Sequence, residues 1–158
     1  MRVVAQRVAR AAVRVEGETV GAIGRGLLVL CAFQATDDTA CVQWMAAKLA
    51  ELRIFPDADG KMNRSLREVG GAVLAVSQFT LYGDCRKGRR PSFVGSAPAA
   101  QAAALYEEFL AALRDSDLAV ASGVFQAMME VELINDGPVT LILDRDARDA
   151  APAGGGGS

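Results

Sequence analysis

Two short segments of the chain carry polar groups of the types that take part in catalysis. Ser77-Gln78-Phe79-Thr80 places two hydroxyls and an amide directly after an apolar stretch. Asn135-Asp136-Gly137-Pro138-Val139-Thr140 places a glycine–proline pair among polar residues. Neither segment is specific alone, because a hydroxyl at a strand end usually satisfies nearby backbone groups, and an X-Pro bond is cis in only about 5–6% of cases. Their residue types indicate a polar pocket in a soluble domain.

The chain contains no histidine. This excludes Ser-His-Asp and Cys-His mechanisms, histidine-ligated metals and imidazole as a general base. The three cysteines, Cys31, Cys41 and Cys85, form no C-x-x-C pair, and their odd number argues against a disulfide framework or a zinc site. Asp57-x-Asp59-Gly60 lacks the glutamate that completes an EF-hand loop. We therefore expect neither a metal nor a cofactor.

Positive charge is concentrated in one place although the whole chain is slightly acidic. Lysine and arginine number 17 against 19 aspartates and glutamates, a formal net charge of −2. A basic loop nevertheless gathers four cations around Gly88, namely Arg86, Lys87, Arg89 and Arg90. A compact basic loop on an acidic chain suits a partner whose phosphates meet the protein at one spot. A solvated loop with no partner is the alternative for such a charge run.

Hydrophobic periodicity predicts the elements that must position these segments. Alternation predicts a β-hairpin over 3–23 with its turn at 16–18, and the apolar run from Leu27 to Phe33 predicts a strand buried on both faces. Helical spacing predicts a helix over 37–52 and another that opens at 96–98 and runs to about Leu113. Further strands are predicted at 54–55, 72–81, 118–122, 124–134 and 139–143, with a turn at 135–138.

Many strands with only two helices predict an α+β fold, in which antiparallel and mixed β-sheets roll into a barrel-like core with two flanking helices. We expect one domain over 1–145 and a flexible tail rich in alanine, proline and glycine over 146–158. The apolar run at 27–33 is too short to span a bilayer, and the first 14 residues lack the apolar core of a signal peptide. A cytoplasmic protein without a membrane partner is expected.

Three longer motifs, in this order, carry a resemblance to a known family. They are Ser77-Gln78-Phe79-Thr80-Leu81-Tyr82, Arg86-Lys87-Gly88-Arg89-Arg90-Pro91-Ser92-Phe93 and Asn135-Asp136-Gly137-Pro138-Val139-Thr140. Shorter matches at 1–8, 24–30, 52–55 and 60–63 extend the similarity over nearly the whole chain. On these motifs the sequence resembles the bacterial D-aminoacyl-tRNA deacylases. The resemblance implies the fold of that family and a homodimer, with active sites at the subunit interface, that hydrolyses the ester joining a D-amino acid, or glycine, to tRNA.

The resemblance also implies roles for individual residues. The catalytic segment would be Ser77, Gln78, Phe79 and Thr80, whose backbone N–H groups steady an oxyanion while the 2′-hydroxyl of the RNA assists hydrolysis. Gly137 and Pro138, joined by a cis bond, would enter the partner subunit's pocket and reject L-amino acids. The basic loop would meet tRNA phosphates without reading the RNA sequence.

The same resemblance implies that Phe125 and Met129 bind the terminal adenosine of tRNA. The predicted strand places these two side chains on one face. Without the resemblance, core packing is the simpler role for both. Relatives usually carry glycine where Gln126 stands. On strand alternation, Gln126 is expected to face away from Phe125, so that activity survives this difference.

Two other functions remain open at this point. The first is a hydrolase of another ester or amide in which Thr80 or Ser77 is the nucleophile. Nothing nearby in the sequence could take the proton of Thr80, so a positioning role is favoured for this residue. The second is a dimer that binds tRNA through the basic loop without catalysis.

Overall fold

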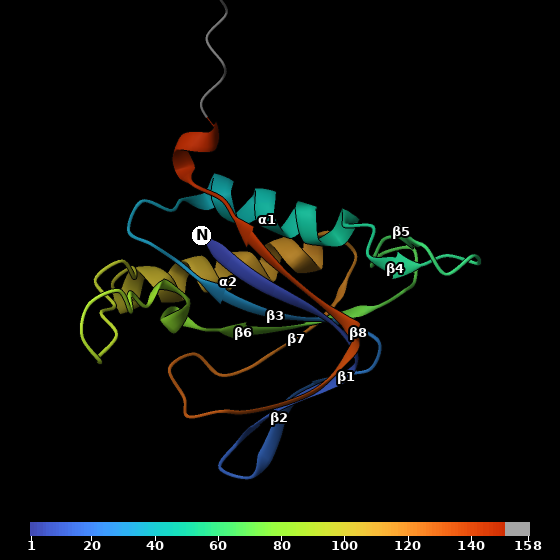
Figure 1. The fold of residues 1–158 in the computed structure, drawn as a ribbon, viewed down its shortest axis with the longest axis horizontal. Helices are drawn as coiled ribbons and strands as arrows, with labels where there is room; N and C mark the ends of the chain where they lie inside the picture. Colours follow the sequence, from blue (N-terminus) through green and yellow to red (C-terminus); the bar gives the residue numbers. More distant parts are fainter. Residues whose placement is uncertain (151–158) are drawn as a thin grey trace, which may run out of the picture.

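The computed structural model of the chain describes residues 1–150, in which one curved mixed sheet carries two α-helices on the same face (Figure 1). The elements are β1 (Arg2–Val15), β2 (Glu18–Ile23), β3 (Gly26–Ala32), α1 (Thr39–Glu51), β4 (Phe55–Pro56), β5 (Met62–Arg64), β6 (Ala72–Ser77), η1 (Phe79–Tyr82), α2 (Ala99–Asp115), β7 (Ala119–Ser122), β8 (Glu130–Asp144) and η2 (Ala147–Ala150). The two η elements are short 3-10 helices.

The long strand β1 organises the sheet because it has neighbours along both edges. One edge pairs antiparallel with β3 over residues 2–8 and with β2 over residues 11–15, while the other edge pairs antiparallel with β8. Parallel pairing of β3 with β6 and of β6 with β7 extends the sheet. A Cβ on Gly21 of β2 would lie 2.6 Å from the carbonyl oxygen of Ser122 in β7, so glycine lets these two strands approach. The sheet is thus nearly closed into a barrel, and the predicted α+β fold is confirmed.

Apolar side chains fill both sides of β3, as its uninterrupted apolar run predicts. On one side, Leu27, Val29 and Cys31 join the buried faces of α1 and α2 in the main core. On the other, Leu28 belongs to a smaller buried cluster made by β1 and β6. Cys31 and Cys41 are buried free thiols, whereas Cys85 is exposed.

Four stretches differ from the prediction. The segment 135–138 is not a turn between two strands, because β8 runs through it as a bulge, with register shifts against β1. The predicted strand over 124–134 begins only at Glu130, since residues 123–129 form a loop. The strand predicted over 72–81 ends at Ser77, where the chain tightens into η1. The short strand β5, which was not predicted, pairs with β4.

The segment predicted as a flexible tail lies mainly outside the described residues. Residues 147–150 form η2, and 151–158 lie beyond the described part. Within residues 1–150, no helix combines the length and apolar character needed to cross a membrane.

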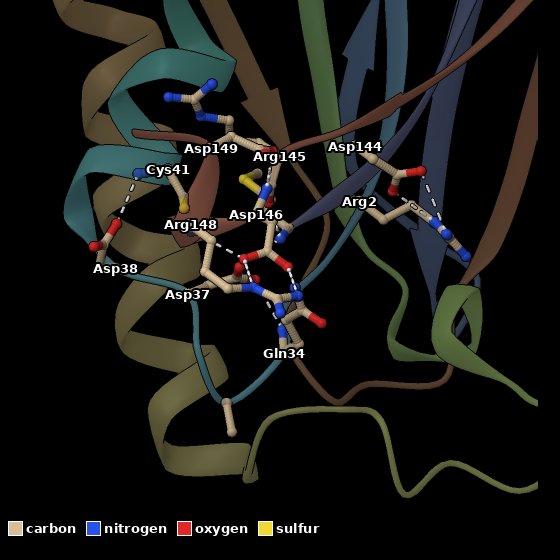
Figure 2. A network of polar contacts seen from close by, with 12 residues as sticks. Arg2, Gln34, Asp37, Asp38, Cys41, Asp144, Arg145, Asp146, Arg148 and Asp149 are labelled. Carbon is tan, nitrogen blue, oxygen red and sulfur yellow. Dashed lines mark hydrogen bonds and ion pairs between the residues drawn. The ribbon is translucent and has the colours of Figure 1, made fainter. Parts of the chain in front are cut away.

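A buried polar cluster that includes Asp37 and Arg145, both labelled in Figure 2, holds the N-terminal ammonium. The N-terminal ammonium of Met1 lies 2.5 Å from Asp37 Oδ1, and both side chains are inaccessible to solvent. The other oxygen of Asp37 accepts the backbone N–H of Gln34 at 2.8 Å, and the ammonium also donates to the carbonyl of Arg145 at 2.7 Å. The start of β1, the loop before α1 and the end of β8 are therefore fixed at one point.

We predict that Asp37→Asn destabilises the protein strongly, because it leaves a buried ammonium without a counter-charge. The free energy of unfolding, measured by urea denaturation, should fall by about 3–5 kcal/mol. The matched control is Glu132→Gln, which removes a carboxylate from exposed pairs with Arg10 and Arg14 and should cost much less. Equal losses in the two variants would contradict a stabilising role for the buried pair.

Candidate active site

A cavity of about 620 Å³ opens where β6 ends. Ser77, Gln78 and Phe79 line it from one side, and residues 125–129 line it from the loop before β8. The start of α2 and the apolar residues Phe33 and Val76 complete the wall. Residues from distant parts of the sequence thus enclose a space that could hold a small molecule or the end of a larger one.

The backbone at the end of β6 is held on a rigid support. The N–H of Gln78 donates to the carbonyl of Cys31 in β3 at 2.7 Å, after which the chain turns into η1. Phe79 and Thr80 are the first two residues of η1, so their N–H groups have no acceptor within that helix. Two backbone donors are therefore presented at the strand end beside the cavity.

Three of the four predicted catalytic residues lie together on the cavity wall, and the fourth is beside it. Thr80 is exposed and does not line the cavity. Its hydroxyl accepts a hydrogen bond from the side-chain amide of Gln78. The structure therefore links Thr80 to the cavity through Gln78.

As far as residues 1–150 form it, the cavity wall carries no carboxylate, ammonium or guanidinium group. Its one titratable side chain is the Cys31 thiol, whose pKa is raised by burial, so it stays protonated at neutral pH. Among residues 1–150, no group of three or more cysteine, aspartate and glutamate side chains is arranged to hold a metal ion. The described wall can therefore hydrogen-bond a bound molecule and limit its shape, but it includes no side chain that could act as a general base.

Phe125 and Met129 both reach the cavity, although the strand predicted to carry them is a loop. Gln126 takes a left-handed conformation, with φ of 63°, which breaks the strand pattern. The prediction that Gln126 faces away from Phe125 is wrong, because alternation does not hold in a loop and Gln126 also lines the cavity. The two residues that the resemblance assigns to the adenosine thus lie at the cavity, but on a loop and not on the predicted strand.

A buried tyrosine on α2 supports this loop. The ring of Tyr106 on α2 packs against the ring of Phe125, with centroids 5.8 Å apart. Its hydroxyl donates to the carbonyl of Ala75 in β6 at 3.0 Å. A buried tyrosine hydroxyl needs a hydrogen-bond partner. The position of Tyr106 on an apolar helix face could therefore have indicated a contact of this kind.

Gly137 and Pro138 lie away from the cavity, on the exposed bulge of β8. Their peptide bond is cis, and Gly137 has φ of 127°. The almost buried Arg7 holds the bulge from beneath by donating to the carbonyls of Asp136 at 3.1 Å and Ile54 at 2.6 Å. The supporting role of Arg7 was not predicted from the sequence. An arginine among inward-facing valines of β1 could have indicated a buried, hydrogen-bonded charge.

The basic loop is the tip of a small hairpin beyond η1. Asp84 and Ser92 exchange two backbone hydrogen bonds of 2.7 and 2.9 Å, and Gly88 has φ of 67°. The carboxylate of Asp84 binds the guanidinium of Arg86, which lowers the pKa of Asp84 and raises that of Arg86. The four cations of the loop are all exposed.

Comparisons with known proteins agree over almost the whole chain. The sequence model of the D-Tyr-tRNA(Tyr) deacylase family matches residues 4–144. The D-aminoacyl-tRNA deacylase of Desulfitobacterium hafniense is 56% identical over 146 residues, covering 92% of this chain and 98% of the relative. That of Thermus aquaticus is 58% identical over 144 residues, covering 91% and 95%.

Solved structures share the fold. The structure titled c-Myc DNA unwinding element binding protein superposes with a TM-score of 0.87 at 40% identity, covering 93% of this chain and 100% of that one. A probable eukaryotic D-amino acid tRNA deacylase superposes with a TM-score of 0.79 at 23% identity, covering 91% and 98%. The matches in sequence, fold and length all point the same way, and the chain belongs to the D-aminoacyl-tRNA deacylase family.

Proposed function

We propose that two copies of this chain form a homodimer that hydrolyses the ester bond of D-aminoacyl-tRNA, and of glycyl-tRNA mischarged on tRNA-Ala, in the cytoplasm. The chain belongs to the deacylase family, and the observation that carries the proposal is its cavity. This cavity has backbone donors at its edge and no general base among the described residues of its wall. Hydrolysis of an activated ester needs its developing negative charge stabilised, and backbone N–H groups supply that stabilisation.

The separation of Gly137 and Pro138 from the cavity within one chain supports the proposal of a second subunit. The bulge is tied through Arg7 to Ile54, just before the β4–β5 hairpin. In Figure 1 this hairpin and the segment around η1, coloured yellow-green, project at opposite ends of the molecule. A two-fold axis would bring the bulge of each subunit to the cavity of the other.

The outer surface of β8 supports such an association. Within the described residues, this 15-residue strand pairs only with β1, so its other edge has free backbone groups. Ile134 and Ile142, which are 46% and 69% exposed, stand on the same strand. A long apolar edge strand of this kind is normally covered in a native protein.

In the proposed reaction, water attacks the ester carbonyl and the N–H groups of Phe79 and Thr80 donate to the resulting oxyanion. The bond to the ribose 3′-oxygen then breaks, and that oxygen takes up a proton. Because the wall holds no base, the neighbouring 2′-hydroxyl of the substrate assists this proton movement. The products are the free amino acid and tRNA.

Chiral selection is assigned to the partner's bulge. The backbone carbonyls of Gly137 and Pro138 would occupy the space into which an L side chain points, whereas a D side chain points away and glycine has none. Rejection by steric and polar mismatch tolerates many different D side chains. Phe125 and Met129 would hold the terminal adenine, where stacking contributes about 1–3 kcal/mol per base. The basic loop would contact phosphates.

The first test measures release of D-tyrosine and L-tyrosine from matched charged tRNAs. With EDTA present, we expect the D form to be released at least about a hundredfold faster than the L form, because only the L side chain meets the bulge. Binding of both RNAs without release would instead support the dimer that binds tRNA without catalysis. Inhibition by EDTA would contradict a metal-independent reaction.

A second test addresses the bulge itself. We predict that Gly137→Ala reduces the preference for D over L by more than about tenfold, because the new Cβ would lie 2.9 Å from Arg7 Nη2 on a backbone with φ of 127°. The matched control is Gly24→Ala, whose Cβ meets nothing within 4 Å and which should retain the wild-type preference. An unchanged preference in Gly137→Ala would remove the bulge from chiral selection.

A third test separates the deacylase mechanism from a threonine nucleophile. We predict that Thr80→Ala keeps turnover within about tenfold of wild type, because Thr80 lies outside the cavity and has no base to activate it. Loss of a covalent nucleophile would instead lower kcat by a factor on the order of 10⁴ or more. A hydrolase with a threonine nucleophile would also cleave simple esters that have no neighbouring hydroxyl. The loss of that cleavage in Thr80→Ala would favour such an enzyme.

A further inference from the structure

Phe79, the apolar member of the cavity wall at the end of β6, is held by a second aromatic side chain. Its ring meets the ring of Phe93 edge to face, with centroids 5.1 Å apart and planes at 69°. Phe79 is 58% exposed, so the core gives it little support and Phe93 is a main contact. Phe93 directly follows Ser92, where the hairpin that carries the basic loop closes. The pair therefore joins the strand end to this hairpin.

Two other contacts lock the same segment against η1. A Cβ on Gly83 would lie 3.1 Å from Cε1 of Phe93 and 3.0 Å from the carbonyl oxygen of Thr80, so the Phe93 ring packs closely beside that turn. The hydroxyl of Ser96 donates to the carbonyl of Phe79 at 3.1 Å. Phe79 is thus held at its side chain by Phe93 and at its backbone by Ser96.

We propose that Phe93 is a positioning residue for deacylation: by packing on Phe79 it fixes the direction of the N–H groups of Phe79 and Thr80. This inference rests on the proposed function, in which those groups stabilise the oxyanion. An oxyanion donor is effective only within a narrow range of distance and direction, and small displacements lower the rate steeply. Phe93 itself does not line the cavity and so acts through Phe79.

A positioning role predicts a change in kcat with little change in KM. Phe93→Ala should lower kcat by about 10- to 100-fold, whereas KM for D-tyrosyl-tRNA stays within about threefold of wild type. The same loss of kcat should appear with D-tyrosine esterified to adenosine alone, because this substrate has no phosphates for the basic loop to bind. A residue that only contacts RNA would instead change KM, and only for the tRNA substrate.

The experiment compares wild type, Phe93→Ala, Phe93→Tyr and Val94→Ala on both substrates, with thermal unfolding recorded for each. Phe93→Tyr keeps the ring and should restore kcat to within about threefold of wild type. Val94, the next residue along, is 92% exposed and is the matched control for loss of an apolar side chain. Its substitution should leave kcat unchanged.

A double-mutant cycle with Phe79→Leu completes the test. If Phe93 acts through Phe79, the doubly substituted protein should lose no more activity than the more damaged single variant. The inference is overturned if Phe93→Ala retains kcat within twofold, if it changes KM alone, or if the two losses multiply. An inactive wild type would instead overturn the proposed function, so the two failures are distinguishable.

Discussion

The backbone groups of β1 must be hydrogen-bonded along both edges, because this strand runs through the middle of the sheet. No single neighbour supplies all the partners on its first edge, which β3 and β2 share. The second edge is satisfied by β8 alone, which must therefore be at least about as long as β1. The length of β8 is what carries the chain from the loop beside the cavity, through the bulge, to the far end of the sheet.

A buried cation adds a second constraint at the middle of β1. The guanidinium of Arg7 is almost fully buried, and a buried charge is tolerated only when it is hydrogen-bonded. Its hydrogen-bond partners are the carbonyls of Ile54 and Asp136, and its Nε also lies 3.6 Å from the carboxylate of Asp136. Asp136 can supply these groups because β8 departs from regular pairing there. The bulge and the arginine stabilise each other, so the part of the deacylase fold proposed to select chirality rests on a satisfied core interaction.

The sequence predicted the elements whose hydrophobic pattern is local. The apolar run of β3, the two helices and the hairpin of β1 and β2 follow from periodicity, and the motif at the end of β6 was found from its polar residues. The loop at 123–129 was not predicted, because its residues alternate as a strand would and only the left-handed backbone of Gln126 breaks the pattern. Continuity of β8 through Asn135 was missed because turn-forming residues also form bulges when a neighbouring strand pairs on either side. The support from Arg7 and Tyr106 depends on contacts across the fold, which local patterns do not encode.

The donors at the end of β6 belong to the main chain, and this has a consequence for how the protein can evolve. No substitution except proline removes a backbone N–H, so side chains around the cavity can change without deleting these donors. Under the proposed function, variation at cavity side chains other than Phe79 would alter the shape of the cavity and the range of accepted amino acids while the backbone donors persist. The fold keeps these donors in the chain, and the side chains that do not orient them are the ones free to change.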